Sequence, residues 1–96
     1  METPPPAAHR ASLEIRNRLG LHARAAALLV QTASRFDAEV SVSKDGHTAN
    51  GRSIMGIMML AAEQGSHIDV ATAGPQGAEA LEAIRQLVEA RFEESE

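Results

Sequence analysis

The sequence predicts an α+β fold, a two-layer open-faced sandwich with the element order β-α-β-β-α-β-α. Three observations lead to it. Four short segments alternate apolar and polar residues, three longer segments carry apolar residues at helical spacing, and Asp45-Gly46 between two of the strands is a strong hairpin signal. Half-polar strands and helices with one apolar stripe pack as a single sheet with all three helices on one face.

The first half of the chain supplies a tail, a strand and a helix. Residues 1–11 include three successive prolines and are expected to form a flexible tail, which leaves residues 12–96 as one domain. Leu13 and Ile15 then alternate with polar residues as in a half-buried strand, and residues 17–20 are typical of a turn. A helix is expected over residues 23–36. Its apolar face consists of Ala26, Leu29, Val30, Ala33 and Phe36.

The second half supplies three strands and two helices. Val40 and Val42 mark a strand that the Asp45-Gly46 turn joins to a short partner over residues 47–50. Ser53 is a candidate N-cap for a second helix that Gly65 would end. A fourth strand is expected over residues 67–73, and a third amphipathic helix over residues 78–92.

Composition excludes several classes of function. The net charge is −4, and the only aromatic residues are Phe36 and Phe92, which disfavours nucleic-acid binding. The chain has no cysteine for disulfides or thiolate metal sites, and no Asp, Glu and His combination has metal-ligand spacing. No apolar stretch is long enough for membrane insertion, and the N-terminus lacks a secretory pattern, so a cytoplasmic protein without a cofactor is expected.

His22 is the main candidate for chemistry. It follows the Gly20-Leu21 turn and precedes the first turn of a helix, where backbone N–H groups lack partners and the helix dipole attracts anions. Arg24 could add a guanidinium to the same place. The dipole disfavours imidazolium, so a neutral, nucleophilic ring that could hold a phosphoryl group is expected. Position alone leaves open that His22 is only a capping or surface residue.

The second helix is apolar nearly all round, which indicates a partner surface. One side carries Ile57, Leu60 and Ala61. The other carries Met55, Met58 and Met59, with Ile54 between the two sides. A small two-layer domain covers only one side of such a helix, so several of these residues should be exposed for adaptable partner binding. The competing interpretation is that the methionines fill an irregular core.

Two segments carry a resemblance to a known family. "GLHARAAALLV", residues 20–30, resembles the active-site segment of the phosphocarrier proteins HPr and NPr, and "GRSIMGIMML", residues 51–60, resembles their second signature. The likeness runs from about Ser12 to Phe92. It implies an HPr-like domain whose four-stranded antiparallel sheet has the order 1-4-2-3, acting as a monomer. The sequence itself does not supply that order.

The resemblance also implies roles for individual residues. His22 would accept a phosphoryl group at Nδ1 from enzyme I and pass it to an enzyme IIA-type protein, and Arg24 would stabilise that group in transit. Ser53 would be the regulatory site of HPr kinase/phosphorylase. The docking surface near His22 would consist of Ile54, Met55 and Met58.

One residue departs from the family pattern. Ala25 stands where the family usually has proline, and because a proline in the first helical turn gives up only an unpaired N–H, alanine should be tolerated. The remaining histidines, His9, His47 and His67, lack a glycine turn or helix start and are expected to be surface or structural residues.

Three alternatives remain beside a phosphocarrier. A histidine phosphatase would need a catalytic acid and a substrate pocket, for which the chain is short. A ligand-sensing domain of ferredoxin-like shape would have a similar element order but leaves His22 and Arg24 unexplained. A regulatory protein-binding module would act mainly through Ser53 and the apolar surface, with little relay activity.

Overall fold

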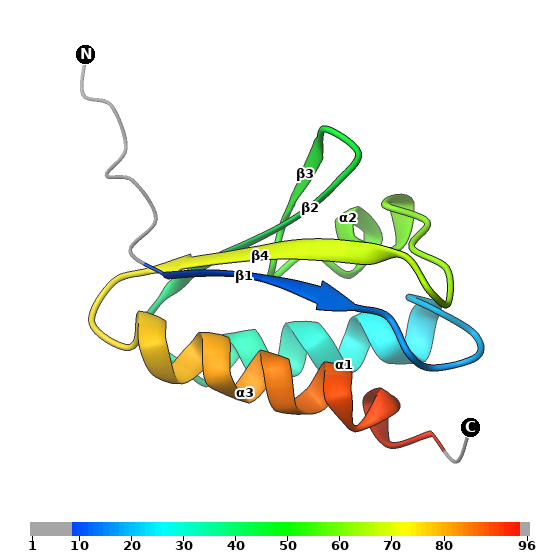
Figure 1. Ribbon diagram of the computed structural model, residues 1–96. Helices are drawn as coiled ribbons and strands as arrows, with labels where there is room; N and C mark the ends of the chain where they lie inside the picture. Colours follow the sequence, from blue (N-terminus) through cyan, green and yellow to red (C-terminus); the bar gives the residue numbers. More distant parts are fainter. Residues whose placement is uncertain (1–8, 95–96) are drawn as a thin grey trace.

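The computed structural model describes residues 9–94 and confirms the α+β class. The sheet is four-stranded and antiparallel, with the order β1-β4-β2-β3. Helices α1 and α3 lie side by side beneath one face of the sheet (Figure 1), and the short α2 packs against α1. The elements are β1 (His9–Glu14), α1 (Ala23–Ser34), β2 (Glu39–Lys44), β3 (His47–Asn50), α2 (Ile54–Met59), β4 (His67–Ala73), α3 (Gly77–Glu89) and a 3-10 turn, η1 (Arg91–Glu93).

The hairpin and the strand register follow the sequence pattern. Asp45 and Gly46 both have positive φ, 51° and 82°, as the tight turn between β2 and β3 requires. Strand β4 pairs with β1 on one side and β2 on the other, so that Leu13 lies opposite Ile68 and Val42 opposite Val70. These four side chains are buried, which places them on the face covered by the helices.

The core is almost entirely aliphatic. Its fully buried large side chains include Ile15, Leu29, Ile57 and Ile84, together with a single ring, Phe92. Helix α1 contributes alanines as well, which lets its backbone approach the sheet closely. Phe36, which the sequence analysis placed on the apolar face of the first helix, is only half-buried and packs at the edge of the core.

Two boundaries near the N-terminus differ from the sequence prediction. Strand β1 begins at His9 rather than Ser12, because β4 offers pairing partners as far as Thr72. Residues 9–11 therefore belong to the sheet and not to the tail, while residues 1–8 lie outside the described part. Helix α1 ends at Ser34 rather than Phe36, because the next two N–H groups bond to carbonyls three residues back and tighten the chain.

The second helix is shorter than predicted. It ends at Met59, well before Gly65, since Ala61 takes a left-handed φ of 52°. This turn buries Leu60 and Ala62, and the Ala62 carbonyl accepts a hydrogen bond from Leu21 N–H at 2.9 Å. A tertiary contact, not a glycine, therefore sets the end of α2. Helix α3 likewise stops at Glu89, and the chain continues through a turn that buries Phe92.

Candidate functional site

The loop between β1 and α1 is held in one conformation by buried contacts. Asn17 is fully buried and its Nδ2 donates a hydrogen bond to the Gly20 carbonyl at 2.8 Å. Gly20 has φ +66°, and a Cβ at this position would lie 2.3 Å from the Ala62 carbonyl oxygen. Only glycine fits such a close backbone approach. The loop that carries His22 is therefore fixed against the chain that follows α2.

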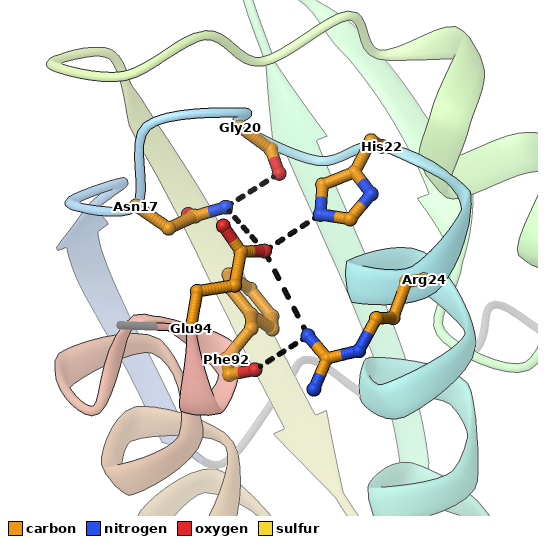
Figure 2. A network of polar contacts seen from close by, with 6 residues as sticks. All are labelled: Asn17, Gly20, His22, Arg24, Phe92 and Glu94. Atoms are coloured by element: carbon orange, nitrogen blue, oxygen red, sulfur yellow. Dashed lines mark hydrogen bonds and ion pairs between the residues drawn. The ribbon is translucent and has the colours of Figure 1, made fainter. Parts of the chain in front are cut away.

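His22 occupies the N-cap position of α1, as the sequence predicts. Its backbone is extended, with φ −74° and ψ 179°, and its carbonyl accepts the first helical hydrogen bond, from Ala26 N–H at 2.8 Å. The side chain makes no capping hydrogen bond, which removes the capping interpretation. Instead, Nε2 lies 2.6 Å from a carboxylate oxygen of Glu94 (Figure 2). With its side chain 28% exposed, the ring remains accessible.

The two nitrogens of the His22 ring have different surroundings. Nε2 contacts the Glu94 carboxylate, while Nδ1 lies on the opposite side of the ring, toward α1 (Figure 2). In a neutral ring that donates Nε2–H to Glu94, the lone pair is on Nδ1. In that tautomer Nδ1 is the ring nitrogen that is free to form a new bond.

Arg24 shares the site but is already engaged there. Its Nη1 donates a hydrogen bond to the Phe92 carbonyl at 3.0 Å and lies 3.9 Å from Glu94 Oε2 (Figure 2). The side chain is about half exposed, 52%. Arg24 and His22 thus lie on either side of the same carboxylate, that of Glu94.

Glu94 and Asn17 are the site residues that the sequence analysis missed. Glu94 lies beyond both the predicted helix over residues 78–92 and α3, is only 15% exposed and also accepts a hydrogen bond from Asn17 Nδ2 at 3.2 Å. The one sequence signal for this arrangement is Phe92, an aromatic residue among charged neighbours, which indicates that the chain end packs on the domain.

Ser53 takes the N-cap position of α2, which confirms the sequence prediction. Its backbone is extended, and Oγ accepts a hydrogen bond from Gly56 N–H at 3.0 Å. The hydroxyl therefore stabilises the first turn of the helix that carries the methionines.

The outward side of α2 is apolar, as predicted. The α2 patch is defined here as four exposed side chains, Ile54 (43%), Met55 (70%), Met58 (38%) and Met59 (78%). Ile57 and Leu60 face the core, whereas Ala61 is exposed and lies past the helix end. The methionines therefore do not fill the core.

The other histidines lie away from this constellation. His9 is half-buried in β1, near Gly77, and not in the tail, while His47 and His67 are exposed at the starts of β3 and β4. Over residues 9–94, no group of three His, Cys, Asp or Glu side chains is placed to hold a metal ion. No helix within that range could cross a membrane.

A family model described as the PTS HPr component phosphorylation site matches residues 9–90. The chain belongs to the HPr family of phosphocarrier proteins. It is 51% identical to the phosphocarrier protein HPr of Neisseria meningitidis serogroup A over 85 residues, which cover 88% of this chain and 96% of that protein.

Solved HPr structures share the fold. The crystal structure of HPr-C-His from Thermoanaerobacter tengcongensis superposes with a TM-score of 0.88 at 43% identity, covering 92% of this chain and 99% of the other. HPr from Bacillus anthracis str. Ames gives 0.80 at 46% identity, with 83% and 95% covered. The protein is therefore an HPr-type carrier and not a catalyst, which excludes the histidine phosphatase and the ferredoxin-like sensor.

Ala25 is the third residue of α1 and is fully buried. It lies in the first helical turn, where the family's proline would sacrifice an N–H that has no intrahelical partner. The substitution leaves the helix start intact, with His22 still at the N-cap.

Proposed function

We propose that His22 carries the phosphoryl group of a phosphoenolpyruvate-dependent phosphotransferase system, taking it from enzyme I and passing it to an enzyme IIA-type acceptor. The observation that supports this most strongly is the ring geometry, with Nε2 paired to Glu94 and Nδ1 facing the start of α1. The Nδ1 lone pair forms the new N–P bond as the donor's bond to phosphorus breaks, and this N–P bond breaks in turn when a nucleophile of the acceptor bonds to phosphorus.

The surroundings of Nδ1 suit a phosphoryl dianion. The first-turn N–H groups of α1 and the helix dipole attract negative charge, and the Arg24 guanidinium is one side chain away. Phosphorylation of the ring therefore offers Arg24 a charged phosphoryl group in place of the neutral Phe92 carbonyl. Hydrogen bonds between two charged groups are stronger than those to a neutral acceptor. We expect Arg24 to exchange the carbonyl for the phosphoryl oxygens.

The test is phosphorylation by cognate enzyme I with phosphoenolpyruvate and Mg²⁺. The chain should gain one acid-labile, base-stable phosphoryl group, which is the behaviour of phosphohistidine. His22→Ala should abolish it, while the exposed His47→Ala and His67→Ala should be labelled like the unaltered chain. Labelling that survives in His22→Ala would contradict the proposal.

The α2 patch is proposed as the docking surface for these partners, with Ile54, Met55 and Met58 at its centre. Helix α2 packs against α1, so the patch and His22 belong to adjoining elements. Exposed methionines adapt to partners of different shape, which suits a monomeric carrier in the cytoplasm that must bind both a donor and an acceptor.

A second function, regulation through Ser53, is supported by a different observation. Ser53 Oγ sits at the first turn of the helix that bears the α2 patch. A phosphate added there by HPr kinase/phosphorylase would put negative charge beside an apolar docking surface and weaken docking. If relay activity is low, the protein would act mainly as a binding module controlled at this serine.

A further inference from the structure

The chain end that follows α3 is built into the site by a strained turn. Arg91, Phe92 and Glu93 have successive φ values of 57°, 52° and 63°, a left-handed conformation that L-residues rarely adopt in sequence. Such backbone persists only when the surroundings hold it. Phe92 supplies that hold, since its ring is fully buried in the core. The turn delivers the next side chain, Glu94, to His22.

Three side chains surround the Glu94 carboxylate in the site. Its carboxylate contacts His22 Nε2 at 2.6 Å and Asn17 Nδ2 at 3.2 Å, and Arg24 Nη1 lies 3.9 Å away (Figure 2). Asn17 joins this carboxylate to the Gly20 carbonyl, so the loop before His22 and the chain end share one buried amide. Asn17 and His22 form hydrogen bonds with the carboxylate and Arg24 adds a nearby positive charge, which together fix its position relative to the ring.

We propose that Glu94 is a positioning residue that selects Nδ1 of His22 as the phosphoryl-accepting atom. The proposal rests on the carrier function of His22. Glu94 occupies the approach to Nε2 and accepts a hydrogen bond from Nε2–H, which leaves the lone pair on Nδ1, toward α1. A ring without this partner could turn and present either nitrogen to a phosphoryl donor.

The charge balance of the transfer assigns Glu94 a second effect. When the neutral ring attacks through Nδ1, the N–P bond takes the lone pair, the Nε2 proton stays, and the ring becomes a phosphoimidazolium. The donor keeps the electron pair of the bond that breaks. The positive charge that arises on the ring faces the Glu94 carboxylate, in the way that the aspartate of a catalytic triad faces its histidine. Glu94 therefore stabilises the phosphorylated form of His22.

The competing explanation is that Glu94 only ties down the chain end. A tether of that kind would affect stability but not the choice of ring nitrogen. Measuring which ring nitrogen is phosphorylated distinguishes the positioning role from the tether role. A small phosphoryl donor that needs no docking surface makes this measurement independent of partner binding. Phosphoramidate is suitable, because its P–N bond breaks with loss of ammonia and the phosphoryl group goes directly to imidazole.

The experiment treats the full chain with phosphoramidate and assigns the phosphorylated nitrogen by ³¹P and ¹⁵N NMR. The unaltered chain should carry the group on Nδ1, whereas Glu94→Ala should raise the share on Nε2 by at least about tenfold, since hydrogen bonds to charged groups are worth that factor or more. The matched control is Glu93→Gln, which removes the neighbouring exposed carboxylate and should leave the regiochemistry unchanged.

Glu94→Gln provides a second arm that keeps the fold and the acceptor oxygen but removes the charge. It should retain Nδ1 labelling and slow transfer from enzyme I. Exclusive Nδ1 labelling in Glu94→Ala would overturn the proposal, and so would Nε2 labelling of the unaltered chain. Failure of enzyme I to label the unaltered chain would instead refute the carrier function, so the two failures are distinguishable.

Discussion

Gly20→Ala is the substitution that tests most sharply how the site is built. The added Cβ would lie 2.3 Å from the Ala62 carbonyl oxygen, which is backbone and cannot turn aside, and the φ of +66° is itself unfavourable for alanine. Left-handed backbone costs alanine about 1 kcal/mol, and displacing the loop loses the Leu21 to Ala62 hydrogen bond, about 1 kcal/mol more. We expect destabilisation of about 2–3 kcal/mol, or a melting temperature lower by roughly 10–20 °C.

The matched control is Gly65→Ala. Gly65 also has a positive φ, +90°, but a Cβ there meets nothing within 4 Å, so only the backbone cost of about 1 kcal/mol applies. Thermal unfolding followed by circular dichroism gives both values, and enzyme I transfer to His22 should slow in Gly20→Ala alone. Equal melting temperatures for the two variants would refute the claim that the loop is packed against the chain beyond α2.

Three other substitutions test separate parts of the account. Met55→Glu should weaken binding to enzyme I, measured by calorimetry, without lowering the melting temperature, whereas Ala78→Glu at an exposed position of α3 should leave binding unchanged. A large loss of stability in Met55→Glu would show that Met55 belongs to the core. Ser53→Asp should slow phosphoryl transfer from enzyme I in stopped-flow assays, whereas Ser53→Asn, an equally good N-cap without charge, should transfer at the unaltered rate. Equal rates for Ser53→Asp and Ser53→Asn would refute the regulatory role of Ser53. Phe92→Ala should cost about 3–5 kcal/mol in denaturant titrations because its ring is fully buried, and a loss below about 1 kcal/mol would contradict that burial.

Much of the fold could be predicted because the relevant signals are local. Alternation, helical spacing and the Asp45-Gly46 turn gave the element order, and the position of His22 before an apolar helix gave its place at the N-cap. The strand order came only with the family resemblance. Alternation fixes which side chains face the helices, but it does not fix which strands are neighbours.

The features that escaped prediction depend on contacts between distant residues. Glu94 lies 72 positions from His22, and although Phe92 indicates that the chain end packs on the domain, no local pattern distinguishes Glu94 from the neighbouring glutamates. The end of α2 was missed for the same reason, since the turn at Ala61 exists to place Ala62 against the loop before His22. Local propensity carries no information about either contact, because each depends on the packed domain.

We propose that one atom, Nδ1 of His22, carries the phosphoryl group. The most direct measurement treats the full chain with cognate enzyme I and phosphoenolpyruvate and locates the group by ³¹P and ¹⁵N NMR under alkaline conditions. The geometry of Glu94 and the start of α1 predicts a single phosphohistidine at Nδ1 of residue 22. A phosphoryl group on Nε2, on another histidine, or on no histidine at all would contradict the account.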